Sequence, residues 1–132
     1  MEINNILLVD DDDSIRFIGE LALHEVGGWN VETAVSGPDA IDKARVLNVD
    51  LILLDVMMPG MDGFAALERL RSDELTCRIP VVFVTAKVQP GEIDTYIAAG
   101  ALGAVAKPFD PMCLPDQIRE IARNIVVTRN LA

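Results

Sequence analysis

Short apolar runs alternate with amphipathic runs along the whole chain. The apolar runs have the length of strands and predict five of them, over residues 6–9, 31–35, 51–54, 81–84 and 104–106. The amphipathic runs predict five helices, over residues 14–25, 38–47, 63–70, 92–99 and 114–125. Regular alternation of strands and helices indicates an α/β fold rather than a sandwich or a bundle.

The first, third and fourth apolar runs consist almost entirely of Val, Ile, Leu and Phe. Central strands of a parallel sheet have this composition because helices cover both of their faces. We therefore expect these three strands to form the middle of one parallel sheet.

The polar residues that stand out all follow predicted strands. They are Asp10, Asp11, Asp12 and Asp13 after the first strand, Asp55 after the third, Thr85 after the fourth and Lys107 after the fifth. The carboxyl ends of parallel strands meet at one edge of the sheet, where ligands of open α/β folds usually bind. Each residue alone has an ordinary explanation, such as a helix cap for Asp12 or Asp13. As a set, they predict a charged site at one sheet edge.

The residue types of this set fit metal-assisted phosphoryl chemistry. Asp10 and Asp11 directly follow a buried strand, where a carboxylate needs a cation or hydrogen-bond donors. Mg²⁺ fits best, because it prefers a few carboxylates together with water and phosphate oxygens. Asp55 could attack phosphorus as a carboxylate nucleophile. Lys107 would then supply positive charge to the phosphoryl group, and the Thr85 hydroxyl a hydrogen bond.

Composition narrows the choice of partners and location. The formal net charge is -10 and the pI about 4.3, so we expect neither nucleic acid nor anionic lipid as a partner. We find no signal peptide and no apolar run near the ~18 residues of a membrane span, which predicts a cytoplasmic protein. With 132 residues, we expect a single domain over residues 1–132 without an output domain. Cys77 and Cys113 are expected to be free thiols.

In the residues of the predicted charged site and in the segments around them, the sequence resembles the receiver domains of two-component response regulators. The resemblance covers about residues 5–126, and residues 6–11, 53–63, 84–86 and 107–109 carry it. It implies a flavodoxin-like, doubly wound sheet of strand order 2-1-3-4-5 with five helices. It also implies a cis bond between Lys107 and Pro108.

The resemblance also implies a role for each site residue. Asp55 would be the phosphoacceptor, Thr85 the switch hydroxyl and Lys107 the phosphoryl partner. Asp10, Asp11 and Asp55, together with the Met57 backbone carbonyl, would hold Mg²⁺.

By the same resemblance, a phosphohistidine on a sensor histidine kinase or phosphotransfer protein would be the phosphoryl donor. The response would be a change in the docking surface for a downstream protein, formed by the fourth helix, fifth strand and fifth helix, about residues 92–125. Such a protein is a switch rather than a turnover enzyme. A phosphorelay intermediate or a phosphate sink without an effector target remains an open alternative.

The sequence departs from the family pattern in the fifth strand. Receivers commonly carry Tyr or Phe three residues before the lysine, where the ring moves together with the threonine, and this chain has Ala104 there. The usual route of the signal is therefore missing. Met57 and Lys87, which flank the phosphoryl group in this family, do not resemble residues that direct hydrolytic water, so we expect a moderately long-lived phosphoryl group.

Three other functions compete with this interpretation. Residues 10–14 loosely match the start of haloacid-dehalogenase-like phosphatases, in which Asp10 would be the nucleophile, but the chain is short for that family. A docking module that is never phosphorylated is disfavoured by the intact acidic, hydroxyl and lysine set. A flavin binder would need a Ser, Thr or Gly-rich phosphate loop in place of the aspartates. His24, far from the acidic cluster, is expected to be an ordinary histidine.

Overall fold

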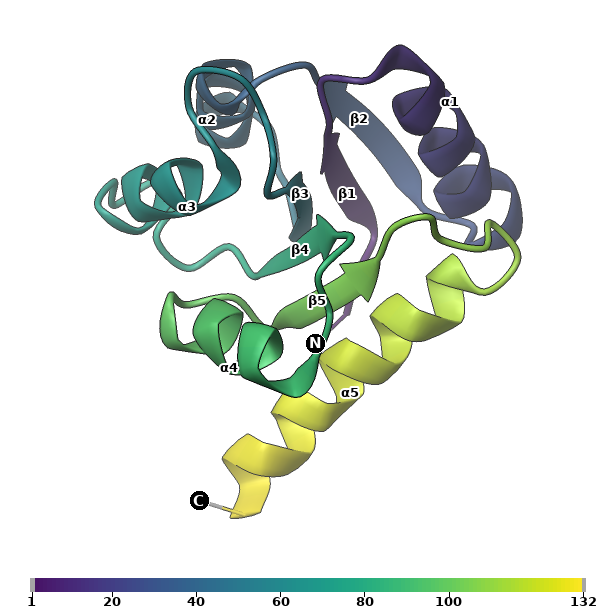
Figure 1. The fold of residues 1–132 in the computed structure, drawn as a ribbon, viewed down its shortest axis with the longest axis vertical. Coiled ribbons are helices and arrows are strands. Elements are labelled where there is room, and N and C mark those ends of the chain that lie inside the picture. Colours follow the sequence, from purple (N-terminus) through teal and green to yellow (C-terminus); the bar gives the residue numbers. More distant parts are fainter. Residues whose placement is uncertain (1, 132) are drawn as a thin grey trace.

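The computed structural model describes residues 2–131, with side chains described as far as Arg123. The strands are β1 (Asn5–Val9), β2 (Asn30–Ala34), β3 (Leu51–Asp55), β4 (Val81–Thr85) and β5 (Gly103–Ala106). They form one sheet of order β2-β1-β3-β4-β5 in which every neighbouring pair is parallel (Figure 1). The three most apolar strands lie at its centre, as their composition predicts.

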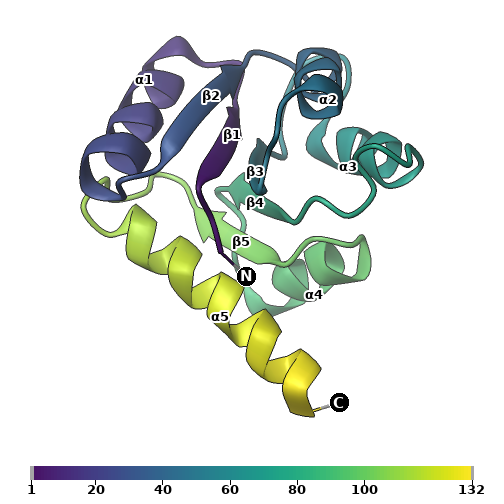
Figure 2. The ribbon, with the colours of Figure 1, turned by 180° about the vertical axis from the view of Figure 1, so that it is seen from behind.

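Helices cover both faces of this sheet. They are α1 (Asp13–Leu21), which continues into the π-helical turn η1 (Ala22–Val26), α2 (Gly37–Val46), α3 (Gly63–Arg71), α4 (Pro90–Ala98) and α5 (Leu114–Leu131). The helices α1 and α5 lie on one side, and α2 and α3 on the other, with α4 near β5 (Figures 1 and 2). This is the doubly wound arrangement that the resemblance implied.

Two apolar clusters fill the space between the sheet and its helices. One joins β1, β3 and β4 to α2, α3 and α4, and includes Phe83, Leu67 and Tyr96. The other joins the opposite face to η1 and α5, and includes Leu23 and Ile118. Alternate residues of each central strand therefore enter opposite clusters, so both faces of the strands are buried.

The element boundaries differ from the predicted ones by a few residues, with one change of helix type. The predicted first helix ends in the π turn η1, where the Gly27 amide donates to the Ala22 carbonyl at 3.0 Å. Wider turns of this kind do not alter the apolar spacing enough to be seen in a sequence. The helix α4 begins at Pro90, two residues before the prediction, and proline at the first helical position is a start signal that we did not use.

Two further expectations concern features outside the sheet. Cys77 and Cys113 are free thiols, as predicted. Within residues 2–131, no helix has both the length and the apolar character that crossing a membrane requires.

Candidate functional site

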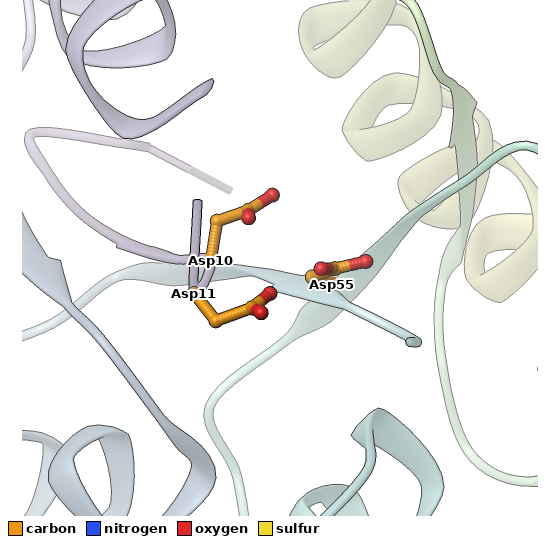
Figure 3. A group of neighbouring side chains, drawn as sticks. All are labelled: Asp10, Asp11 and Asp55. Atoms are coloured by element: carbon orange, nitrogen blue, oxygen red, sulfur yellow. The ribbon is translucent and has the colours of Figure 1, made fainter. Parts of the chain in front are cut away.

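Three carboxylates gather at the carboxyl ends of β1 and β3. Asp10, Asp11 and Asp55 each offer an oxygen, and these oxygens all lie within 4.8 Å of one another (Figure 3). Asp10 and Asp55 are buried, whereas Asp11 is exposed. The predicted convergence of the first and third strand ends is therefore confirmed, and the cluster is open to solvent on the side of Asp11.

Lys107, at the end of β5, joins the two buried carboxylates. Its ammonium nitrogen lies 2.7 Å from Asp10 Oδ2 and 3.2 Å from Asp55 Oδ2. The Lys107-Pro108 peptide bond is cis, as the resemblance implied. The two buried carboxylates thus share the ammonium of Lys107, whose single positive charge offsets only one of their two negative charges.

These contacts change the ionisation of Asp55 and of Lys107. Burial and then the Asp10 carboxylate raise the pKa of Asp55, and the Lys107 ammonium only partly opposes them. Burial alone would lower the pKa of Lys107, but hydrogen bonding and attraction to Asp10 and Asp55 outweigh it, so the pKa of Lys107 is raised. Lys107 therefore remains positively charged at neutral pH, beside a carboxylate that holds its proton more firmly than usual.

The loop that follows β1 is fixed by its own aspartates. Asp12 is the N-cap of α1, since its carboxylate accepts from the amides of Ser14 and Ile15. Asp10 Oδ1 accepts from the Asp12 amide at 2.9 Å. Arg16 donates to the Asp10 carbonyl at 2.7 Å. Asp12, rather than Asp13, thus has the capping role, and the carboxylates of Asp10 and Asp11 are directed to the site.

Backbone contacts fix the chain around Asp55. The Met57 amide donates to Asp55 Oδ1 at 3.2 Å, and the Gly63 amide donates to the Val56 carbonyl at 2.9 Å. A Cβ atom on Gly63 would lie 2.6 Å from the Asp55 carbonyl oxygen, so only glycine allows α3 to approach this closely. The Met57 side chain is exposed.

Thr85, at the end of β4, has a partner that the sequence reading missed. The residue is buried, and its hydroxyl accepts from the Lys87 amide at 3.1 Å. The Thr85 hydroxyl also lies 3.5 Å from the hydroxyl of Tyr96, which comes from α4. A large aromatic residue in the fourth helix of a chain with Ala104 in its fifth strand is the signal that could have revealed this pair.

The acidic cluster is chemically suited to a magnesium ion. The ligand atoms available are carboxylate oxygens, which hard divalent cations prefer. The buried carboxylates of Asp10 and Asp55 already hold one cation, the ammonium of Lys107. Because Asp11 is exposed, a metal ion could reach the cluster from solvent as a second cation. These residues fit Mg²⁺, whereas the role of the Met57 carbonyl stays a prediction.

His24 is exposed on η1, where its Nδ1 lies 2.8 Å from the Trp29 carbonyl oxygen.

Comparison with known sequences identifies relatives across most of the chain. The family model of the response regulator receiver domain matches residues 6–119. The transcriptional regulatory protein AfsQ1 of Streptomyces coelicolor is 38% identical over 119 residues, which are 90% of this chain and 51% of that protein. The response regulator PleD of Caulobacter vibrioides is 39% identical over 119 residues, which are 89% of this chain and 26% of that protein. The chain thus spans about half or less of these two relatives.

Solved structures agree with the sequence comparison. The chemotaxis response regulator CheY4 of Vibrio cholerae is 32% identical and has a TM-score of 0.83, with 91% of this chain and 99% of that chain covered. The N-terminal domain of a response regulator receiver protein from Methanoculleus marisnigri is 34% identical, with a TM-score of 0.72 over 90% of this chain and 96% of that chain. Together with the strand order and the family match over residues 6–119, these likenesses establish that the chain belongs to the response regulator receiver domain family.

Proposed function

We propose that this chain is a phosphorylatable switch in which Asp55 accepts a phosphoryl group in a Mg²⁺-dependent reaction. The observation that carries the proposal is the pair of contacts that Lys107 makes with buried Asp10 and Asp55, at 2.7 and 3.2 Å. Burying these charged groups costs folding free energy. Such a cost is common at functional sites, and binding of a phosphoryl group and a metal ion would account for it here.

The positions of the side chains support the following reaction. A carboxylate oxygen of Asp55 attacks phosphorus, the bond between phosphorus and the donor's imidazole nitrogen breaks, and its electron pair stays on that nitrogen. Lys107 leaves its contact with Asp55 and attracts the phosphoryl oxygens, to which the Thr85 hydroxyl donates a hydrogen bond. Asp10, Asp11 and Asp55 would hold a Mg²⁺ ion, which would supply further positive charge to those oxygens.

The donor in this proposal is the phosphohistidine of a sensor histidine kinase or phosphotransfer protein in the cytoplasm. The output is docking of a downstream protein on α4, β5 and α5. The chain acts as a switch that gains and loses a phosphoryl group rather than as a turnover enzyme. Family membership supports this assignment, as does the acidic cluster.

Incubation with acetyl phosphate and Mg²⁺, followed by mass spectrometry, tests the acceptor. We expect the wild type to gain one phosphoryl group, with EDTA preventing the gain, and Asp55→Asn to gain none. Equal labelling of the two proteins would refute the proposal. Peptide mapping should locate the label on Asp55, and a label on Asp10 would instead support a phosphatase-like reaction.

The lifetime of the label is a separate measurement on the same sample. After removal of acetyl phosphate, we expect slow loss of the label, because neither Met57 nor Lys87 is suited to direct water at phosphorus. A half-life of seconds would contradict this expectation without affecting the assignment of Asp55.

A further inference from the structure

Tyr96 brings an aromatic ring to the threonine of the site from a different element than the family pattern predicts. It is the only tyrosine of the sequence, it lies on α4, and it is 3% exposed. Its ring packs against Phe83 of β4 and Phe64 of α3, with centroid distances of 5.4 and 5.8 Å. Ala104, which pairs with Phe83 across the sheet, packs against the same apolar cluster. The small Ala104 on β5 and the large Tyr96 on α4 thus pack in the same apolar cluster.

The hydroxyl of Tyr96 has a strong contact and a weak one. It donates its single hydrogen to the Lys87 carbonyl at 2.7 Å. Towards Thr85, 3.5 Å away, it can therefore act only as an acceptor, so the hydrogen in that contact comes from Thr85. The contact is long for two hydroxyl groups, so little energy is needed to break it.

The Thr85 hydroxyl cannot donate to Tyr96 and to a phosphoryl group at the same time. The Thr85 hydroxyl has one hydrogen, and it points either to the Tyr96 oxygen or to a phosphoryl oxygen on Asp55. A phosphoryl oxygen carries charge and accepts a stronger hydrogen bond than a phenol oxygen does. Phosphorylation therefore removes Thr85 from Tyr96.

The backbone of Lys87 connects the two side chains a second time. Its amide donates to Thr85 Oγ1 at 3.1 Å, and its carbonyl accepts from Tyr96. A displacement of the Thr85 hydroxyl is thereby transmitted through one peptide residue to the ring of Tyr96, and so to α4.

We propose that Tyr96 couples the Thr85 hydroxyl to α4 and takes over the part that an aromatic residue at position 104 would otherwise play. The inference rests on the proposed function, because a phosphoryl group on Asp55 is the event that moves Thr85. Tyr96 acts through Thr85 and Lys87, so it is a positioning residue.

Two matched substitutions on α4 test the coupling. Tyr96→Phe keeps the ring and removes the hydroxyl that reaches Thr85 and Lys87. Thr95→Val also removes one hydroxyl from α4, but that hydroxyl donates to the Gly91 carbonyl within the helix. Amide chemical shifts of each ¹⁵N-labelled protein are compared before and after addition of Mg²⁺ and beryllofluoride, which binds carboxylate oxygen in the shape of a phosphoryl group.

In the wild type and in Thr95→Val, we expect amide shifts both around Asp55 and in α4. In Tyr96→Phe, the shifts around Asp55 should persist while those in α4 fall by about threefold or more, as for mutations that interrupt coupling between sites. Unchanged shifts in α4 would overturn the role of Tyr96. Absence of shifts around Asp55 in the wild type would overturn the proposed function itself.

A second measurement does not depend on the folding of a variant. Incorporation of 3-fluorotyrosine labels Tyr96 alone, because the chain has one tyrosine. We expect its ¹⁹F signal to move when Mg²⁺ and beryllofluoride are added to the otherwise unchanged protein, and to stay in place in Thr85→Ala and in Asp55→Asn. A signal that does not move in the otherwise unchanged protein, while amides around Asp55 do, would overturn the inference.

Discussion

Asp55 is a buried carboxylate with a small number of partners. Its oxygens receive a hydrogen bond from the Met57 amide and an ion pair from Lys107, which is itself shared with Asp10. Desolvation, together with the neighbouring Asp10 carboxylate, outweighs this support, and the pKa of Asp55 is raised. The ionised Asp55 carboxylate is therefore a source of instability in the metal-free protein, and strongly perturbed groups of this kind are common at functional sites.

Replacement of Asp55 by asparagine should stabilise the metal-free fold at neutral pH. The folded pKa of Asp55 lies above its unfolded value, so stability falls as the pH rises from the unfolded to the folded pKa. At a pH above its raised pKa, the wild type carries the cost of the ionised group, and Asp55→Asn does not. We expect a gain of about 1 kcal/mol, or a few degrees in Tm. Urea unfolding in EDTA measures it.

The pH dependence identifies the cause of this gain. The advantage of Asp55→Asn should shrink as the pH falls through the raised pKa of Asp55, because the wild-type carboxyl then becomes neutral too. Asp42→Asn, at an exposed position of α2, is the control for loss of one negative charge. A variant Asp55→Asn that is no more stable than the control at pH 7 would show that desolvation is not the dominant effect.

At the scale of elements, the approach of α3 to the end of β3 determines where Asp55 lies. The helix begins at Gly63, after the N-cap Asp62, and Gly63 contacts the backbone of Asp55 and Val56. A Cβ atom there would be 2.6 Å from the Asp55 carbonyl oxygen and 2.8 Å from the Val56 Cα, and neither backbone atom can rotate away.

Gly63→Ala should therefore displace the acceptor loop and destabilise the fold. Overpacking of this kind costs about 1–3 kcal/mol, and we also expect slower labelling by acetyl phosphate because Asp55 moves relative to Lys107. Gly91→Ala is the matched control, since its Cβ atom would meet nothing within 4 Å and alanine favours a helix. Denaturant unfolding of both variants checks the prediction, and equal stabilities would contradict it.

The elements themselves were largely predictable from the sequence, because each central strand is a continuous apolar run such as residues 51–54. The gathering of Asp10, Asp55 and Lys107 was predictable for a related reason, since each of them lies at the carboxyl end of a strand, and these ends meet. The π turn η1 and the pairing of Tyr96 with Thr85 were not predicted. The π turn leaves the apolar spacing almost unchanged. The contact of Tyr96 with Thr85 depends on how side chains of two elements meet, and apolar spacing carries no information on that.

At the scale of the whole molecule, the chain carries a large net negative charge, and three of its carboxylates are also clustered in one place. The formal net charge is -10, so the folded chain repels itself and any added salt should stabilise it by screening. The cluster of Asp10, Asp11 and Asp55 adds a local site for a divalent cation. A stabilising effect of MgCl₂ therefore has a screening part and a binding part, and these must be separated.

Magnesium should raise Tm more than sodium does at equal ionic strength. At ten times its Kd, an ion that binds only the folded chain adds about 1.4 kcal/mol, which is a shift of about 3–6 °C for a domain of this size. NaCl screens the net charge without filling the cluster, so the difference between the two salts measures binding.

Two aspartates that follow β1 provide matched variants for testing the difference between stabilisation by MgCl₂ and by NaCl. Asp11→Asn removes an exposed carboxylate of the cluster and should abolish most of the excess stabilisation by Mg²⁺. Asp13→Asn removes an exposed carboxylate that pairs with Arg16, outside the cluster, and should retain the excess. Both variants lose one negative charge, so screening by NaCl should be the same in each. If the two variants lost the Mg²⁺ effect equally, the ion would be responding to the net charge of the molecule rather than to the three clustered carboxylates.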